Sequence, residues 1–108
     1  MGSFDIAKHG GSVLFVSGDL DMATAEQLSS TLAPAVAEGG PITVDISHLR
    51  FMDSIGLHAL VNAAAALDDR GCIIIHGLDG SASIRKLFEL TRVGELRNIH
   101  VIPCEVLV

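Results

Sequence analysis

The sequence predicts an α/β domain with one mixed, mostly parallel five-stranded sheet and helices packed mainly on one side. Two observations support this fold class. From residue 42 onward the apolar patterns alternate as strand, helix, strand, helix, strand, which is typical of right-handed crossovers between parallel strands. Before that point, two short apolar runs flank Gly10-Gly11 and are expected to form an antiparallel hairpin. The 108 residues suit a single domain, residues 1–108.

The first half of the chain is expected to contain two strands and a helix. Residues 4–7 alternate in polarity and residues 13–16 are apolar, which predicts the two strands of the hairpin. After a loop at residues 18–21, apolar side chains spaced by three and four predict a helix over residues 23–38. Pro34 lies inside that helix and should kink or divide it, because proline lacks the N–H that an interior helical residue donates.

The second half is expected to contain three strands and two helices. Residues 42–46 predict the third strand, and a helix is expected to start after Asp53-Ser54 and to end near residue 67. Residues 72–76 are almost continuously apolar, a pattern typical of a strand covered on both faces. Ser81 is a favourable N-cap for a third helix, and residues 99–102 predict the fifth strand.

The composition argues against several classes of protein. The formal net charge of −6 argues against binding to nucleic acid or to anionic membranes, which both need clustered basic side chains. No apolar run is long enough to span a membrane and the N-terminus lacks the form of a signal peptide, so a cytoplasmic location is expected. The histidines lack metal-ligand spacing and no cofactor motif occurs, so neither metal nor cofactor is expected. Cys72 and Cys104 are expected near opposite ends of the sheet, as free thiols.

Residues 45–57 contain the candidate functional residues. Ser54 stands at the expected start of a helix, where its hydroxyl can cap the helix by accepting from the backbone N–H groups of the first turn. The same N–H groups favour an anion, so a phosphorylated serine also fits this position. Ser47 is expected to hydrogen-bond the loop that it opens. An enzyme is not expected, because Met52 stands where a nucleophile elbow needs glycine and no phosphate-binding loop is present.

The same residues closely resemble the signature of anti-sigma factor antagonists in the STAS domain family. The resemblance covers Asp45-Ile46-Ser47 and then Phe51-Met52-Asp53-Ser54-Ile55-Gly56-Leu57. Two further stretches match in order and spacing: Gly18-Asp19-Leu20-Asp21 with Thr24-Ala25, and Ser81 with residues 84–90. The resemblance therefore covers nearly the whole chain and implies a STAS-like fold. Many members carry Ser or Thr where this chain has Ile55, which leaves Ser54 as the acceptor hydroxyl.

The resemblance also implies a function. In anti-sigma factor antagonists, the serine directly after the aspartate is phosphorylated by an anti-sigma factor that is also a serine kinase, and by position this serine is Ser54. The unphosphorylated protein binds the anti-sigma factor and frees the sigma factor, the phosphorylated protein releases it, and a phosphoserine phosphatase resets the switch. Two alternatives stay open: a STAS scaffold or transport-associated subunit that needs no phosphorylation, and a small nucleotide-binding domain.

The residues around the acceptor serine are candidates for partner binding. They are Asp21, Asp53, Ser54, Ile55, Gly56 and His58. Three of them also have a structural interpretation: Asp21 as a cap of the first helix, Asp53 as a helix-start acid and Gly56 as a packing glycine. Phe51 and Met52, just before the acceptor, are expected in the core rather than at an interface.

Overall fold

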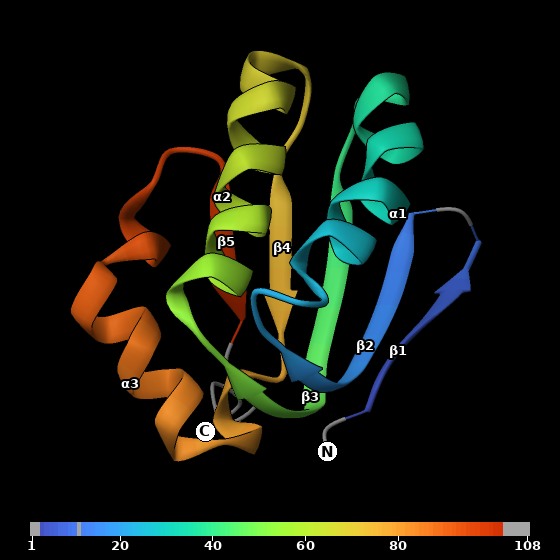
Figure 1. Cartoon of the computed structure of the whole chain (residues 1–108). Helices are drawn as coiled ribbons and strands as arrows, with labels where there is room; N and C mark the ends of the chain where they lie inside the picture. Colours follow the sequence, from blue (N-terminus) through green and yellow to red (C-terminus); the bar gives the residue numbers. More distant parts are fainter. Residues whose placement is uncertain (1–2, 11, 103–108) are drawn as a thin grey trace.

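The computed structural model describes residues 3–10 and 12–102, and its strands form one sheet in the order β1-β2-β3-β4-β5 (Figure 1). β1 is antiparallel to β2, whereas the other neighbouring strands are parallel, which confirms the predicted mixed sheet. The strands are β1 (Phe4–His9), β2 (Val13–Leu20), β3 (Ile42–Met52), β4 (Ile73–His76) and β5 (Ile99–Ile102). The α-helices are α1 (Ala25–Glu38), α2 (Ser54–Leu67) and α3 (Ala82–Thr91), and the short 3-10 helices are η1 (Asp68–Arg70), η2 (Leu78–Gly80) and η3 (Val93–Glu95).

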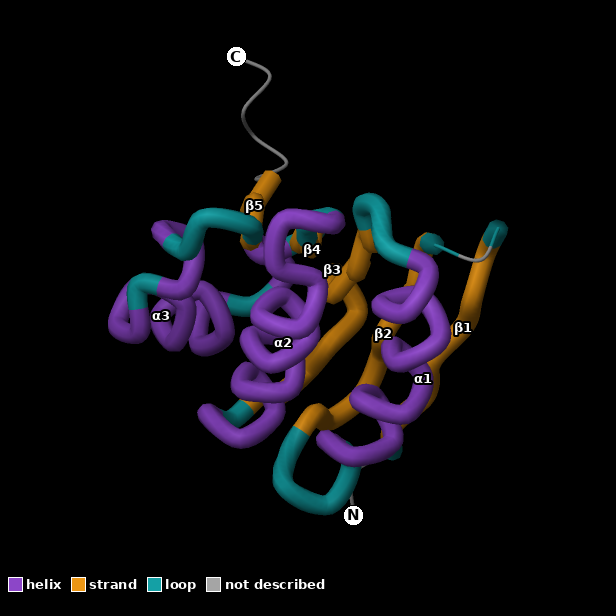
Figure 2. The backbone as a smooth tube through the Cα atoms, turned by 90° about the horizontal axis from the view of Figure 1, so that it is seen from above, coloured by secondary structure: helices purple, strands orange, loops and turns teal. Residues whose placement is uncertain are grey.

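The three α-helices lie on one face of the sheet (Figures 1 and 2). α1 and α2 run side by side across the sheet, and α3 lies beyond α2 on the side of β5. The opposite face, here called the open face, carries the paired residues Phe15, Asp45 and His76, together with Ile74. The prediction that the fourth strand is covered on both faces is wrong, because Ile73 and Ile75 are buried under the helices whereas Ile74 and His76 are only half-buried.

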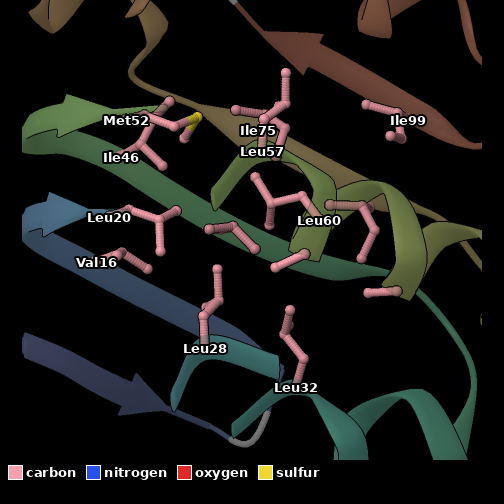
Figure 3. Close-up of a cluster of buried hydrophobic side chains, with 14 of the residues drawn as sticks. Val16, Leu20, Leu28, Leu32, Ile46, Met52, Leu57, Leu60, Ile75 and Ile99 are labelled. Carbon is pink, nitrogen blue, oxygen red and sulfur yellow. The ribbon is translucent and has the colours of Figure 1, made fainter. Parts of the chain in front are cut away.

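The hydrophobic core lies between the sheet and the helices (Figure 3). Leu28 and Leu32 are four residues apart on α1, so they share one face of the helix and are almost completely buried. Leu60 of α2 is equally buried in the same core (Figure 3). Full burial of one such side chain contributes about 1.5–3 kcal/mol, so this layer stabilises the packing of α1 and α2 on the sheet.

β3 is longer than predicted and continues through the expected loop as far as Met52. Two register shifts against β2 explain the difference. Phe15 pairs with Asp45 but Ser17 pairs with His48, so β3 contains an extra residue, and a second shift follows Gly18. Such bulges interrupt the period of two that identifies a strand in a sequence.

α1 is unbroken, so the predicted division at Pro34 is wrong. Pro34 is exposed, and it lies on the solvent side of the helix, where water can hydrate the carbonyl that proline leaves without a helical donor. The helix begins at Ala25, two residues after the predicted start, because side-chain hydrogen bonds hold the preceding residues in a turn.

The structure also bears on the expectations about membrane spans, metal binding and the cysteines. No helix within residues 3–10 and 12–102 has the length and apolar character needed to cross a membrane. Within the same residues, no group of three or more His, Cys, Asp or Glu side chains could hold a metal ion. Cys72, directly before β4, is a free thiol. Cys104 lies outside the described residues, so the separation of the two cysteines stays a prediction.

Candidate functional site

The loops that follow β2 and β3 meet at one edge of the sheet, at the bottom of Figure 1. Because the two strands are parallel neighbours, their carboxyl ends lie together. The backbone N–H of Asp53 donates to the carbonyl oxygen of Leu20 at 3.2 Å, which joins the two ends directly. Asp21 and Ser54 therefore lie at the same edge of the sheet. We call this region the carboxyl edge and define it by Asp21, Met22, Phe51, Asp53, Ser54, Ile55 and His58.

Asp53 is the N-cap of α2, and Ser54 is the first residue of the helix. The backbone of Asp53 is extended, and its carboxylate accepts a hydrogen bond from the backbone N–H of Gly56 at 2.8 Å. The interpretation of Ser54 as the cap is therefore wrong. The reason is geometric, since a cap lies one residue before the helix and accepts from the third helical N–H. The side chain of Ser54 is exposed and is not needed to start the helix.

Gly56 is buried where the first turn of α2 packs on the end of β2. A Cβ atom at this position would lie 2.6 Å from the carbonyl oxygen of Leu20 and 2.7 Å from its Cγ. The packing interpretation therefore explains this glycine, because any side chain would push the helix away from the strand. Gly56 does not present a surface to a partner.

Asp21 organises the turn before α1. Its Oδ1 atom accepts from the backbone N–H of Ala23 at 3.0 Å and of Thr24 at 3.2 Å. The Thr24 hydroxyl donates to the carbonyl oxygen of Asp19 at 2.9 Å and accepts from the N–H of Asp21 at 2.9 Å. The expectation that Asp21 caps the first helix is wrong, because Thr24 is the N-cap of α1 and the Asp21 carboxylate accepts only from N–H groups that precede the helix. The carboxylate closes the turn before α1 and is half-exposed at the carboxyl edge.

The exposed side chains of the carboxyl edge combine one hydroxyl with several apolar groups. Ser54 and His58 are exposed, and Ile55 is 47% exposed although it is large and apolar. Met52 is buried, as predicted, but the same prediction for Phe51 is wrong because that side chain is 47% exposed. Met22, which the sequence analysis missed, is 71% exposed. Exposure of Met22 depends on how its loop is placed on the sheet, which periodicity cannot reveal.

A shallow pocket of about 260 Å³ opens beside Ser54, between α2 and η3. The residues that line it are Ser54, Leu57, His58, Val61, Thr91, Val93 and Leu96. Its walls are mainly apolar, and the hydroxyl of Thr91 already donates to the carbonyl oxygen of Leu87 at 2.7 Å. Ser54 therefore borders an apolar surface that is built from two segments far apart in the sequence.

A polar cluster lies away from this pocket, on the open face. The Oδ1 atom of Asp45 accepts from the hydroxyl of Ser47 at 2.6 Å and from its backbone N–H at 2.9 Å. The Oδ2 atom of Asp45 lies 3.3 Å from Nδ1 of His76. Partial burial raises the pKa of the Asp45 carboxyl, but the hydrogen bonds from Ser47 and the contact with His76 outweigh burial and hold the pKa below its usual range.

This cluster corrects the expectation that Ser47 binds the loop it opens. Ser47 lies inside β3 and binds Asp45, two residues earlier in the same strand. The sequence analysis did not foresee that β4 brings His76 to the pair. The serine hydroxyl donates directly to the carboxylate rather than to an intervening imidazole, so the cluster differs from a catalytic triad.

Comparison with known proteins agrees with the architecture. The family described as "Mlab, STAS domain" matches residues 4–102. An anti-sigma-B factor antagonist of Listeria monocytogenes is 31% identical over 94 residues, which cover 85% of this chain and 81% of that protein.

Solved structures give the same fold. An anti-sigma factor antagonist from Mycobacterium paratuberculosis matches with a TM-score of 0.71 at 24% identity, over 93% of this chain and 86% of that chain. The anti-sigma factor antagonist SpoIIAA matches in its unphosphorylated form with a TM-score of 0.66 at 21% identity, over 93% and 87% of the two chains. The phosphorylated form of SpoIIAA, a Bacillus cell fate determinant, matches with a TM-score of 0.59 at 20% identity, over 93% and 91%. The extent of the family match and the identity to the Listeria protein show that the chain belongs to the STAS domain family, in the group that contains anti-sigma factor antagonists.

Proposed function

We propose that this protein is an anti-sigma factor antagonist that binds an anti-sigma factor serine kinase while Ser54 is unphosphorylated and releases it once Ser54 is phosphorylated. It acts as a regulator and not as an enzyme, and a phosphoserine phosphatase returns it to the binding form. The observation that carries the proposal is the division of roles at the start of α2. Asp53 caps the helix, so the exposed hydroxyl of Ser54 is available to a kinase.

The partner surface in this proposal is the carboxyl edge. Ile55 and Met22 supply exposed apolar area around the serine, and Asp21 and His58 supply polar groups. A neutral hydroxyl among exposed apolar side chains can be buried against a partner, whereas a charged phosphoserine at the same position cannot be buried without a large desolvation cost. Such a surface therefore suits a partner that discriminates between serine and phosphoserine. Gly56 contributes indirectly, because its packing on Leu20 fixes the height of Ser54 above the sheet.

The proposed release follows from electrostatics. A phosphoserine adds about −1.5 to −2 charges at neutral pH. One new like-charge contact at about 4 Å is worth up to about 4 kcal/mol at an effective dielectric near 20, and half of that lowers affinity roughly thirtyfold. No rearrangement of the sheet is required. The shared fold of the two forms of SpoIIAA supports this view, since both match the same chain.

The experiment is a phosphorylation assay on the full chain. The purified protein and its Ser54→Ala variant are incubated with ATP and each anti-sigma-type kinase of the same organism, and intact masses are recorded. The proposal expects one phosphoryl group on the wild type and none on the variant. If no kinase modifies the protein but a kinase still binds it in pull-down, the protein is a phosphorylation-independent scaffold and the proposal is wrong.

A further inference from the structure

Ser54 and His58 lie one helical turn apart on α2 and line the same pocket. Both side chains are exposed. Residues separated by four positions on a helix have Cβ atoms about 5–6 Å apart, so their side chains meet on the helix surface. A phosphoryl group on Ser54 would extend the shorter side chain towards the imidazole.

His58 is the one titratable residue among those that line the pocket. Leu57 and Val61 of α2, and Val93 and Leu96 around η3, form apolar walls that offer no competing donor. Two charged groups flank the lining residues in the sequence: Asp53, which caps α2, and Arg92, which forms an exposed ion pair with Glu95 at 3.3 Å. The imidazole is thus the lining group that can supply an N–H to a phosphate at this position.

We propose that His58 is a positioning residue that binds the phosphoryl group of phosphorylated Ser54 and makes the inactive state of the switch depend on pH. This inference rests on the proposed phosphorylation of Ser54. Histidine is the side chain that changes charge between pH 5 and 8, and the second ionisation of phosphoserine falls in the same range. An imidazolium beside the phosphate favours the dianion, and the dianion in turn favours the imidazolium.

The pairing has a consequence for the switch. A phosphate held by His58 stays at the carboxyl edge, which is the surface that the proposed partner contacts. The phosphorylated form is then excluded from the partner by occupancy of that surface as well as by charge. The effect depends on pH, because histidine and phosphoserine as classes both change charge between pH 5 and 8.

The test uses the full chain with phosphoserine incorporated at position 54 during synthesis, so that no kinase is involved. The titration of the phosphate is followed by ³¹P NMR in three proteins: the otherwise wild-type chain, its His58→Gln variant and its His48→Gln variant. His48 is also exposed but lies in β3, outside the pocket, and serves as the matched control.

We expect the midpoint of the phosphate titration to lie lower in the wild type than in His58→Gln by roughly 0.2–0.4 pH unit, the size of a helical pair four residues apart. His48→Gln should titrate as the wild type does. Equal midpoints for the wild type and His58→Gln, with both proteins folded by circular dichroism, would overturn the role of His58. That outcome is separate from failure of the proposed function, which the kinase assay on the unmodified chain detects.

Discussion

The carboxylate of Asp53 accepts a hydrogen bond from the backbone N–H of Gly56 at 2.8 Å, and this contact fixes where α2 begins. The backbone carbonyl of Asp53 accepts from the N–H of Leu57 at 3.0 Å, the first bond of the helix. Because Asp53 supplies the cap, the hydroxyl of Ser54 is not used for capping and is exposed to solvent. The structural and the proposed regulatory roles are thus carried by adjacent residues.

Replacement of Asp53 by alanine should lower the free energy of unfolding by about 1 kcal/mol, because it removes the side-chain acceptor of an N-cap. Asp53→Asn is the matched control, since asparagine caps nearly as well and should cost much less. Urea unfolding of the three proteins at neutral pH measures the difference. Equal destabilisation by asparagine and alanine would show that the charge, and not the cap, is what matters.

Replacement of Gly56 by alanine should destabilise the protein by roughly 1–3 kcal/mol, although alanine is the better helix former. The new methyl group would lie 2.6 Å from the carbonyl oxygen of Leu20, which is backbone and cannot move freely. Gly94→Ala is the control, because its added Cβ would lie 3.5 Å from Cγ2 of Val101, an ordinary contact. Thermal unfolding should separate the two variants, and a Gly56→Ala protein as stable as the wild type would contradict the packing role.

The Asp45 cluster should stabilise the fold in a manner that depends on pH. The pKa of Asp45 lies below its ordinary value of 3.8, so the contribution is present above the unfolded-state pKa and is lost as pH falls through the folded-state pKa. Ser47→Ala removes a hydrogen bond to the charged carboxylate and should cost about 1–2 kcal/mol at pH 7. The deficit should shrink below about pH 4, as the carboxylate is protonated.

Urea unfolding of Ser47→Ala and the wild type at pH 7 and at pH 3 measures this dependence. Asp45→Asn provides the control, because a side chain without a titrating carboxyl cannot contribute to the acid-dependent loss. A deficit of the same size at both pH values would mean that the serine acts through packing alone.

Replacement of Ile55 by aspartate should abolish binding to the partner kinase while it changes the stability by less than about 0.5 kcal/mol, as is usual for an exposed position. The substitution places a charge directly beside the unmodified serine. Ala65→Asp adds the same charge to an exposed position of the same helix about 15 Å further along the axis, and should leave binding intact. Calorimetric titration with the kinase identified in the phosphorylation assay gives both affinities. Similar affinities for the two variants would place the interface elsewhere.

Much of the fold was predictable because local pattern and global architecture agree. The alternation of strands and helices after residue 42 predicted the parallel sheet, and Gly10-Gly11 predicted the hairpin. The ends of elements were less predictable. β3 extends to Met52, beyond the residues that alternate in polarity, because two bulges interrupt the alternation without ending the strand. α1 continues through Pro34 because that residue faces solvent.

Some features of the candidate site could likewise be predicted from the sequence, whereas others depend on the tertiary structure. The sequence by itself determined that an aspartate and a serine stand at the start of an α-helix that follows a central strand, because these are local properties of spacing and residue type. Only the tertiary structure decided their roles. The contact of Gly56 with Leu20, the exposure of Phe51 and Met22, and the pocket shared by Ser54 and His58 all depend on segments distant in sequence. Such contacts are set by strand order and helix packing, which no single stretch of the chain specifies.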